Sequence, residues 1–443
     1  MTVSHWRRSA QPPTTLDVDV CVIGAGICGI AAAIALQKKH QSVVVLERHA
    51  LASGASSRNA GFLMRGAACH YAEAIDLYGQ ERAKALWRFT EENLEGLRAE
   101  GCEALSSYRR VPSMLLALRA GSGNEPWRPS AIDAAANRAG LERSRDLMRQ
   151  DGLEVGWLEP GDTGPKDSAW ASGQIASALV NPGDASMNSY ELMKMLASKL
   201  RPHASVAGNM TAPVIENQEV FDIADENGRS FLSELEPKLL TLNRLPPRGG
   251  SGRIAVRTAD FTIRCERVLV CTNAYASLLL PRFEGIVMPR RGQMLALDAQ
   301  GRTLGASYYC NDGSEYFRQT ADGTIVVGGC RTYFAEEEVG FEDRTTARVQ
   351  EALESFARTM LGYEKGEVLP ITSRWAGTMG FSPDGLPLIG PIAPASPVWF
   401  CGGFTGHGMS MGYKAAHEAV DAMLSGREAM FALSRLAAQF KAR

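Results

Sequence analysis

The feature that most constrains this 443-residue chain is an alternation of strand and helix signals between Val18 and Gly66. The apolar, β-branched run Asp19–Ile23 is typical of a buried parallel strand. A glycine-rich turn, GAGICG, follows it, and an alanine-rich run after the turn predicts a helix. A second strand, predicted over Ser42–Leu46, ends at Glu47. The order of strand, glycine turn, helix, strand and acid predicts a dinucleotide-binding unit.

Each part of this unit has a physical task. Gly24 allows the tight turn, Gly26 lets the backbone approach a pyrophosphate, and Gly29 lets the helix pack closely on the sheet. The pyrophosphate would meet unpaired N–H groups at the start of the helix, around Ile27. Glu47 would accept hydrogen bonds from ribose hydroxyls and would repel a 2′-phosphate, so we expect FAD or NAD rather than NADP.

The segment that follows Glu47 favours FAD. It reads GASSRNAGF over Gly54–Phe62 and is small, polar and flanked by glycines. Such a loop brings backbone N–H groups against a phosphate and then against an isoalloxazine ring, which an NAD enzyme has no evident reason to carry. A flexible surface loop is the alternative, although the apolar residues that follow, Leu63 and Met64, indicate burial.

The same segment carries a resemblance to a known family. Gly54-Ala55-Ser56, Arg58-Asn59 and Gly61 resemble the D-amino-acid-oxidase-like family of FAD-dependent amine oxidoreductases. This family includes glycine and sarcosine oxidases and γ-glutamylputrescine oxidase, and the segment looks most like the last of these. The resemblance covers nearly the whole chain. It implies an α/β fold with a Rossmann-type FAD-binding domain and a discontinuous α+β substrate domain built on an antiparallel sheet.

The resemblance also implies how the two domains alternate along the chain. After Gly66 the pattern becomes helical, with apolar residues at helical spacing over Tyr71–Ala99. We therefore predict an FAD-binding domain over 14–68, 175–285 and 370–443, and a substrate domain over 69–174 and 286–369. An inserted loop is expected near 230–252, where the punctuation RLPPRGGSG occurs.

The family's FAD contacts are expected at the positions of this chain that match its motifs. In the first unit and the loop after it they are Gly24, Gly26, Ile27, Gly29, Glu47, Arg48, Ala55, Ser56, Asn59, Ala60, Gly61 and Phe62. Further along, the backbone of Val220 is expected to meet the adenine. Ile254–Thr258 and Arg267–Thr272 are predicted as strands of a small antiparallel meander, and Thr272 lies at the end of the second, which resembles the family's third FAD-contacting strand.

A second glycine-rich turn, GGFTGHGM, precedes a helix predicted over Gly412–Leu424. Its N–H groups would meet the flavin N1/C2=O edge, where negative charge gathers on reduction. A tight turn without a ligand is the alternative. The expected contacts of this turn are Gly403, Gly406, His407, Gly408 and Met409.

The family resemblance implies a redox reaction on a C–N bond. The substrate amine would pass a hydride to the flavin N5, and water would hydrolyse the resulting imine. We therefore expect an FAD-dependent enzyme that oxidises a primary or secondary amine or amino acid, with oxygen or another compound as electron acceptor. Two alternatives stay open: an FAD-dependent 2-hydroxy-acid or polyol dehydrogenase, and a flavin-binding protein without turnover.

Two arginines that bind the substrate carboxylate in glycine-oxidase-like relatives are missing here. Met379 and Met409 occupy their positions, which argues against a simple α-amino acid held in the usual way. Tyr316 and Arg318, on a hairpin expected to face the flavin, are the leading candidates for substrate binding, and Arg65 is next. For both arginines an ordinary surface cation is the alternative.

Two further expectations concern the flavin itself. His407 would polarise the substrate or lie at the flavin edge, with a packed helix-cap histidine as the alternative. The cysteine that attaches flavin covalently in sarcosine oxidases would fall near Gly377 or Thr378, so we expect noncovalent FAD.

Composition argues against several other classes of protein. The formal net charge of −2 supplies no basic field for nucleic acid, and no apolar run reaches the length of a membrane span. The nine cysteines are scattered and include no C-x-x-C pair, which is typical of reduced thiols in a cytoplasmic protein. No signal peptide and no metal site are predicted.

Overall fold

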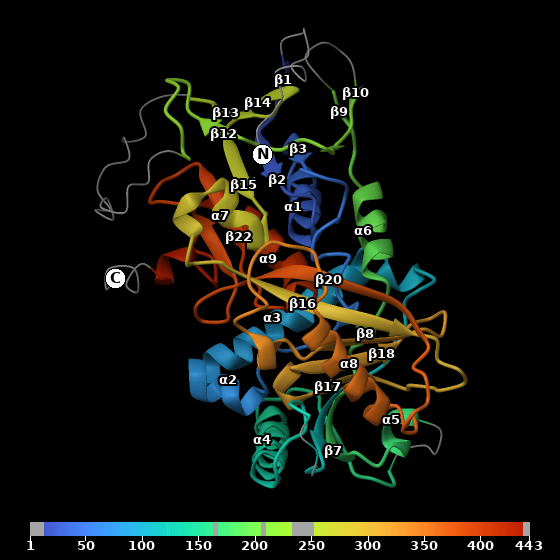
Figure 1. Ribbon diagram of the computed structural model, residues 1–443. Coiled ribbons are helices and arrows are strands. Elements are labelled where there is room, and N and C mark those ends of the chain that lie inside the picture. The colour runs from blue at the N-terminus through green and yellow to red at the C-terminus, as the bar shows by residue number, and fades with distance from the viewer. Residues whose placement is uncertain are drawn as a thin grey trace.

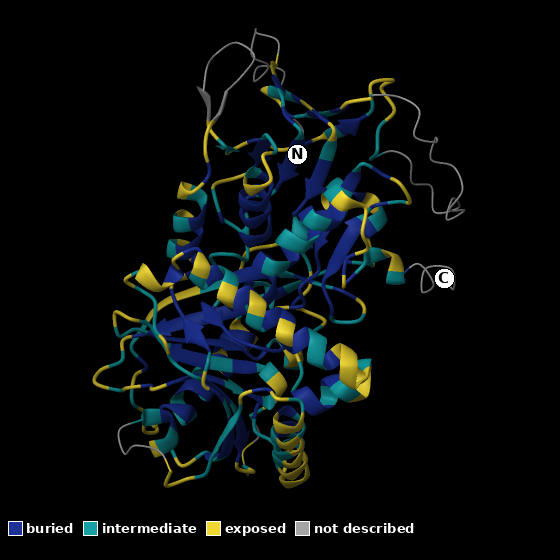
Figure 2. Cartoon of the chain, turned by 180° about the vertical axis from the view of Figure 1, so that it is seen from behind, coloured by how far each residue is buried: buried dark blue, intermediate teal, exposed yellow. Residues whose placement is uncertain are grey.

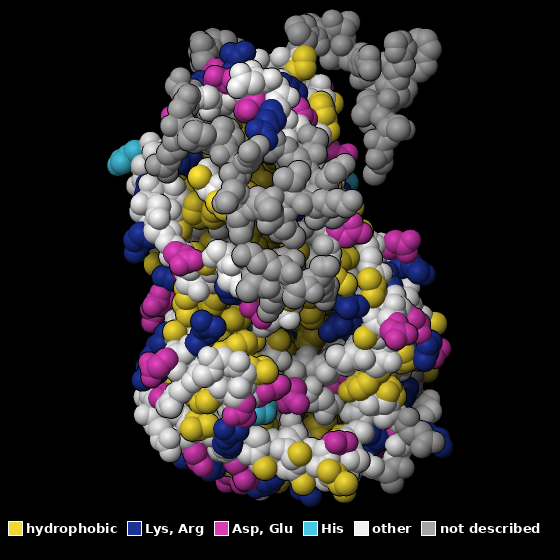
Figure 3. Space-filling view, turned by 90° about the vertical axis from the view of Figure 1, so that its left-hand side faces the viewer, with side chains coloured by type: hydrophobic (Ala, Val, Ile, Leu, Met, Phe, Trp, Pro, Cys, Tyr) yellow, Lys and Arg dark blue, Asp and Glu magenta, His cyan; other side chains and the backbone are white. Residues whose placement is uncertain are grey.

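The computed structural model describes residues 13–121, 123, 125–162, 167–204, 210–232 and 252–436. Two large sheets dominate it, and they occupy the upper and lower parts of the molecule in Figure 1. Most of the insertion predicted near 230–252 lies outside the described residues. On the face seen in Figure 3, side chains of both charge signs are interspersed, as the small net charge predicts.

The upper, six-stranded sheet contains the strands predicted around the glycine turn. Its order is β11 (Val214–Ile215), β3 (Val43–Leu46), β2 (Val20–Ile23), β15 (Arg267–Val270), β22 (Val398–Gly402) and β21 (Leu388–Pro391). All neighbours are parallel except β21, which pairs antiparallel with β22. β2 and β3 are buried at every position, which is why their sequences are continuous apolar runs.

Two helices begin at the carboxyl ends of strands in this sheet and pack against each other. Helix α1 spans Ile27–Lys38 and is buried from Ile27 to Leu36, which its small alanine side chains permit. Helix α9 spans Gly408–Ser425 and therefore begins earlier than the predicted Gly412. In Figure 1 both helices lie beside the strands of the upper sheet.

A small four-stranded sheet flanks the upper sheet. Its order is β1 (Thr14–Asp17), β14 (Phe261–Cys265), β13 (Ile254–Arg257) and β12 (Asp222–Ala224). The sequence pattern placed Arg267–Thr272 in this antiparallel meander, and that prediction was wrong. β15 instead pairs parallel with β2 and β22, because Val268–Val270 is fully buried and needs neighbours on both sides.

The lower, eight-stranded sheet is almost entirely antiparallel. Its order is β20 (Ile371–Phe381), β16 (Met288–Leu297), β19 (Ile325–Gly329), β18 (Glu315–Gln319), β17 (Ser307–Cys310), β5 (Ser113–Leu118), β7 (Ile175–Asn181) and β6 (Gly156–Leu158). Only β17 and β5 pair in parallel. Helix α8 (Ala347–Met360) covers one face with an apolar stripe. The hairpin predicted around Asp322-Gly323 is present as β18 and β19.

The order of strands in the lower sheet differs from two predicted domain boundaries. The ranges 175–285 and 370–443 were assigned to the FAD-binding domain, yet β7 and β20, with which they begin, are strands of the lower sheet. β7 is held there by β5 and β20 by β16. These two strands therefore belong with the predicted substrate domain, while the division of the chain into two domains stays a prediction.

The remaining elements connect or cover the sheets. The helical pattern over Tyr71–Ala99 forms two helices, because Gly79 takes a left-handed φ of 84° between them. The other helices and strands are α2 (Tyr71–Tyr78), α3 (Gln80–Ala99), α4 (Ala131–Gln150), α5 (Ser168–Ala171), α6 (Ser189–Ser198), α7 (Ala276–Leu279), β4 (Phe62–Leu63), β8 (Ala185–Ser186), β9 (His203–Ala204) and β10 (Met210–Thr211). Figure 2 shows the strands of both large sheets in the buried interior and the outer side of α4 exposed. Among the described helices, none is long and apolar enough to cross a bilayer.

One buried acid in the lower sheet makes stability depend on pH. Glu315 in β18 is completely buried, and its Oε2 accepts a hydrogen bond from Asn311 Nδ2 at 2.6 Å. Tyr333 and Cys330 also lie close enough to favour the ionised carboxyl, but less than burial disfavours it. Burial raises the pKa of Glu315 to about 7. A carboxyl whose folded-state pKa is raised favours the folded state at low pH, and this advantage is lost as pH rises from the unfolded pKa through about 7.

We expect Glu315→Gln to remove this pH dependence, because glutamine stays neutral. The variant should match the parent in free energy of unfolding near pH 5 and exceed it near pH 8, by on the order of 3 kcal/mol. Denaturant unfolding at several pH values measures this difference. A constant difference across the range would show that Glu315 ionises normally in the folded protein.

Candidate functional site

The main cavity lies where the two large sheets meet and has a volume of about 770 Å³. On one side it is lined by the carboxyl ends of β2, β3 and β15 and by the starts of α1 and α9. On the other side it is lined by strands β16, β17, β18 and β20 of the lower sheet. Ligands of open α/β sheets bind at the carboxyl ends of the strands, so this is the expected position for a dinucleotide.

The glycine turn between β2 and α1 fits a closely approaching phosphate chain. Gly24 has a φ of 102°, and a Cβ there would lie 2.9 Å from the carbonyl oxygen of Cys271. A Cβ on Gly29 would lie only 1.8 Å from the carbonyl oxygen of Gly24, so the helix rests directly on the turn. Gly26 lines the cavity and exposes the backbone beside Ser56. The geometry agrees with the tasks predicted for Gly24 and Gly29, while the approach of a pyrophosphate to Gly26 stays a prediction.

Side chains that line the cavity already organise the backbone donors at the start of α1. Glu47 Oε2 accepts a hydrogen bond from the N–H of Ala25 at 2.8 Å, and Ser56 Oγ accepts one from the N–H of Ile27 at 2.9 Å. The positive end of the α1 dipole also faces this region. Both N–H groups are therefore occupied, and the expectation of an unpaired N–H group at Ile27 is wrong. An anionic pyrophosphate at this turn would rely on the α1 dipole and would replace Glu47 or Ser56 as the acceptor of these hydrogen bonds.

The loop at Gly54–Phe62 is held in a defined shape from within and from the lower sheet. Asn59 donates from Nδ2 to the carbonyl oxygens of Ala55 and Ser56, both at 3.0 Å, and accepts from the N–H of Gly61 at 2.7 Å. Trp375 in β20 donates from Nε1 to the carbonyl oxygen of Arg58 at 3.0 Å. The flexible-loop alternative is therefore wrong for this segment.

His407 lies at the second glycine turn, directly before α9. Its Nδ1 is 3.2 Å from the carbonyl oxygen of Thr405, which can only accept, so Nδ1 carries the proton and Nε2 is a free acceptor. Burial lowers the pKa of His407, which keeps the ring neutral near pH 7. His407 occupies the N-cap position of α9, although its side chain makes no capping hydrogen bond, so the helix-cap alternative stays beside the flavin-edge prediction.

Most of the predicted site residues line the main cavity. Those that do are Gly24, Gly26, Ile27, Glu47, Arg48, Ala55, Ser56, Asn59, Ala60, Phe62, Val220, Thr272, Tyr316, Gly406, His407, Gly408 and Met409. Predicted residues outside the lining are Gly29, Gly61, Gly403, Arg65 and Arg318. The three glycines among these support the turns that carry their neighbours, whereas the two arginines require a correction.

Arg318 does not face the main cavity, and its cation is used to support the cavity wall. The side chain is only 3% exposed, its Nε donates to the carbonyl oxygen of Ala60, and its Nη2 donates to that of Met187 at 2.7 Å. A Cβ on Gly61 would lie 2.6 Å from this Nη2. The sequence pattern correctly placed Arg318 on the hairpin, but could not show that backbone carbonyls already occupy its donors.

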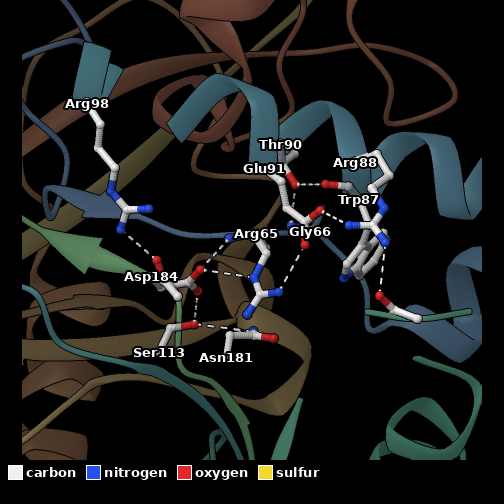
Figure 4. A network of polar contacts seen from close by, with 12 residues as sticks. Arg65, Gly66, Trp87, Arg88, Thr90, Glu91, Arg98, Ser113, Asn181 and Asp184 are labelled. Carbon is white, nitrogen blue, oxygen red and sulfur yellow. Dashed lines mark hydrogen bonds and ion pairs between the residues drawn. The ribbon is translucent and has the colours of Figure 1, made fainter. Parts of the chain in front are cut away.

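Arg65 also lies outside the main cavity, within the polar network of Figure 4. Its Nη1 pairs with Glu91 at 3.0 Å and its Nε with Asp184 at 3.4 Å, and both Arg65 and Asp184 are almost fully buried. Burial raises the pKa of Asp184 to about 6, although Arg65 and Ser113 oppose that shift. Arg65 therefore joins α3 to the β7–β8 connection and is not placed to meet a substrate.

Several cavity residues were not predicted from the sequence. Met294 and Tyr309 line the side formed by the lower sheet, and Arg331 lines it just after β19. The phenyl ring of Phe62 lies 4.8 Å from that of Tyr309 and 6.0 Å from that of Tyr316, measured between ring centroids. The adjacent glycines GG that end β19 were a usable signal for Arg331, because they indicate a sharp change of direction.

Comparisons with known proteins agree with this geometry. γ-Glutamylputrescine oxidoreductase of Escherichia coli is 23% identical, with 98% of this chain and 92% of that protein covered. A glycine oxidase of Geobacillus kaustophilus is 24% identical over 84% of each chain. The crystal structure of glycine oxidase from Geobacillus kaustophilus superposes with a TM-score of 0.64 at 20% identity, covering 95% of this chain and 98% of that one.

The crystal structure of L-proline dehydrogenase from P. horikoshii gives a TM-score of 0.65 at 18% identity, with 94% and 95% of the two chains covered. These structures share the fold. The family model described as FAD-dependent oxidoreductase (DAO) matches residues 19–422. The chain therefore belongs to the DAO family of FAD-dependent oxidoreductases, and FAD is its cofactor.

Proposed function

We propose that this enzyme oxidises a primary or secondary amine or an amino acid at its C–N bond, with noncovalently held FAD in the main cavity. The observation that carries the proposal is that a polar wall and an aromatic wall line the same cavity. The starts of α1 and α9 offer donors for a dinucleotide, and opposite them Phe62, Tyr309 and Tyr316 form an aromatic wall.

The residues that would hold FAD follow the cavity from one end to the other. The turn at Gly24 and Gly26 would take the pyrophosphate, and Glu47 the adenosine ribose. The loop at Gly54–Phe62 would hold the central part, and the turn that contains His407 would meet the flavin edge. Because Gly377 and Thr378 line the cavity where relatives carry a covalent attachment, no thiol is available there for a covalent bond.

FAD, when bound, accepts the two electrons and the hydrogen that leave with the substrate C–H bond. The chain's own part is to bind the substrate with its nitrogen unprotonated, align that C–H bond and exclude water. The aromatic wall of Phe62, Tyr309 and Tyr316 serves exclusion and alignment. The free Nε2 of His407 offers an acceptor for the substrate N–H. The oxidised product is an imine, which water converts to a carbonyl compound and ammonia or a smaller amine.

The relatives support the choice of a C–N bond. Proteins similar to this chain are named for the oxidation of glycine and of γ-glutamylputrescine, which have an amine in common. The two methionines at the sites of the family arginines, Met379 and Met409, both line the cavity. The carboxylate-binding arginines of glycine-oxidase-like relatives are therefore absent from these two positions of the cavity wall.

Product analysis of a single turnover tests the reaction class. The oxidised enzyme is mixed with each flavin-reducing compound without oxygen, and the products are quantified against reduced flavin. We expect one carbonyl product and one ammonia or amine for each flavin reduced. A carbonyl product formed without nitrogen release would support the hydroxy-acid or polyol dehydrogenase instead.

A further inference from the structure

We propose that Arg331 is the anion-recognising residue of this site and that the substrate is an amine bearing a carboxylate in the same molecule. This inference rests on the proposed function and names the substrate class for it. It places the recognition of the acid group at the end of β19, a position unrelated in the sequence to Met379 and Met409, where the expected arginines are absent.

The backbone around Arg331 is shaped to bring this residue over the cavity. Gly329 has a φ of 119°, and a Cβ there would lie 2.0 Å from the carbonyl oxygen of Ser314. Cys330 follows with a left-handed φ of 58°. Two consecutive residues in this conformation turn the chain sharply at the end of β19, and the short helix at Arg331–Phe334 begins there.

A second glycine makes room for the aromatic partner of Arg331. Gly328 pairs with Tyr316 across the β18–β19 ladder, and a Cβ there would lie 2.4 Å from the Tyr316 ring and 2.2 Å from Met294 Sδ. The absent side chain lets the Tyr316 ring lie across β19 beside the cavity. Burial raises the pKa of Tyr316 to about 12, and the nearby charge of Arg331 opposes that shift. Tyr316 therefore stays a neutral hydroxyl donor next to a cation.

The Arg331 guanidinium is without a counter-ion in the described part of the chain. It makes no hydrogen bond or ion pair with the described residues. Its Cζ lies 4.7 Å from the centroid of the Phe381 ring, over the ring face, which is a cation–π contact. Three of the four acids of the cavity wall have other partners: Glu47 the backbone at Ala25 and His49, Asp312 the Asn137 amide, and Asp343 the Arg58 guanidinium. The fourth, Glu219, makes no described contact with Arg331. Burial and then the charge of Arg290 lower the pKa of Arg331, and the nearby Tyr316 and Glu338 oppose this shift only in part. Glu338 is itself paired with Arg291 through Oε2 at 2.8 Å.

A half-buried cation of this kind suits a carboxylate that enters the cavity. The guanidinium offers a planar pair of donors that matches the two oxygens of a carboxylate, and the Tyr316 hydroxyl can add a third donor. The other two arginines of the cavity wall are differently engaged, Arg48 over the Tyr275 ring at 4.9 Å and Arg58 with Asp343. Arg331 is the one among them that shares the aromatic wall of Tyr316.

Ligand titration of the FAD-bound enzyme tests this assignment without requiring turnover. Benzoate and its neutral counterpart benzamide are added to the parent, and the shift of the flavin absorbance bands gives each dissociation constant. We expect the parent to prefer benzoate, and Arg331→Met to weaken benzoate binding roughly 10- to 100-fold while benzamide binding changes less than about twofold. Arg331→Lys keeps the charge without the paired donors. It should bind benzoate more weakly than the parent and more tightly than Arg331→Met.

Arg290→Met is the matched control, since Arg290 lies close to Arg331 but outside the cavity lining, with its Nη1 on the carbonyl oxygen of Ala335 at 3.3 Å. Its benzoate affinity should stay within about twofold of the parent. FAD content and melting temperature are checked first in all variants. If Arg331→Met loses FAD, the titration of Arg331→Lys with benzoate and benzamide tests the assignment instead.

The assignment is overturned if benzoate affinity is the same in the parent and the Arg331 variants, or if benzamide weakens in parallel, which would make Arg331 a support of the flavin. It is also overturned if the parent does not prefer benzoate. Failure of the proposed function is seen separately, because no amine would then reduce the flavin although the titration could still succeed.

Discussion

Replacing Gly29 with alanine will leave most of the purified protein without FAD. A Cβ on Gly29 would lie 1.8 Å from the carbonyl oxygen of Gly24, which is backbone and cannot swing away. The start of α1 would have to move from the turn, and the N–H groups of Ala25 and Ile27 would move with it. Overpacking of this kind costs about 1–3 kcal/mol of folding stability, and moving the turn to relieve the clash would also remove contacts on which FAD binding at this turn depends.

The ratio of FAD to protein after dialysis, read from the visible and ultraviolet absorbance, measures the loss. Gly183→Ala is the control, because a Cβ there would meet nothing closer than Arg65 Nη2 at 3.7 Å and Gly183 lies outside the main cavity. The control should keep the parental FAD ratio. Full FAD occupancy in Gly29→Ala would contradict the placement of the pyrophosphate at this turn.

Arg291→Met should cause the largest loss of stability among single substitutions in the lower sheet. Arg291 in β16 and Glu338 are 1% and 0% exposed, and they meet through Nε and Oε2 at 2.8 Å. Gln293 and Thr346 also donate to the Glu338 carboxylate, at 2.9 Å each. Removing the guanidinium leaves a buried carboxylate without its charge partner, which costs about 3–5 kcal/mol.

Denaturant unfolding at neutral pH measures this loss, and its pH dependence identifies the cause. Burial by itself raises the pKa of Glu338, but Arg291 and its other donors bring it below the ordinary value of 4.5. The stabilisation is therefore present above that value and lost as pH falls through the folded-state pKa, so the difference between variant and parent should shrink in acid. Arg344→Met, which removes an exposed pair with Glu342, should change stability by less than about 0.5 kcal/mol.

The parts of the fold that were predictable from the sequence are those fixed by local pattern. The strand, glycine turn, helix and second strand around Gly24 were predictable because buried parallel strands need continuous apolar runs and the turn needs glycine. The hairpin at Asp322-Gly323 was also predictable, because an Asp-Gly pair between two strand-like runs favours a tight turn between antiparallel strands. β15 was predicted as a strand but assigned to the wrong sheet, because a short apolar run does not state which neighbours it pairs with.

In the candidate site, too, local motifs were predictable and long-range contacts were not. Most predicted residues on the glycine turns line the cavity, since their position follows from the motif itself, and Gly29 and Gly403 support these turns from behind the lining. Arg318 was placed on the right hairpin, but the partners of Arg318 and Arg65 are the carbonyl oxygen of Ala60 and the carboxylate of Asp184, which are distant in the sequence. Arg331 was missed for the opposite reason, because the lack of an ion pair or hydrogen bond with any described residue is visible only in the folded structure.

Anaerobic reduction of the purified yellow enzyme tests the central claim most directly. The flavin absorbance is followed while amines, amino acids, iminodiacids and matched 2-hydroxy acids and polyols are added in turn, and oxygen is then admitted to show whether the reduced enzyme is an oxidase. Bleaching is expected with one class of amine, and carboxylate-bearing members of that class should act at the lowest concentrations. Bleaching by hydroxy acids or polyols, with no response to any amine, would contradict the account.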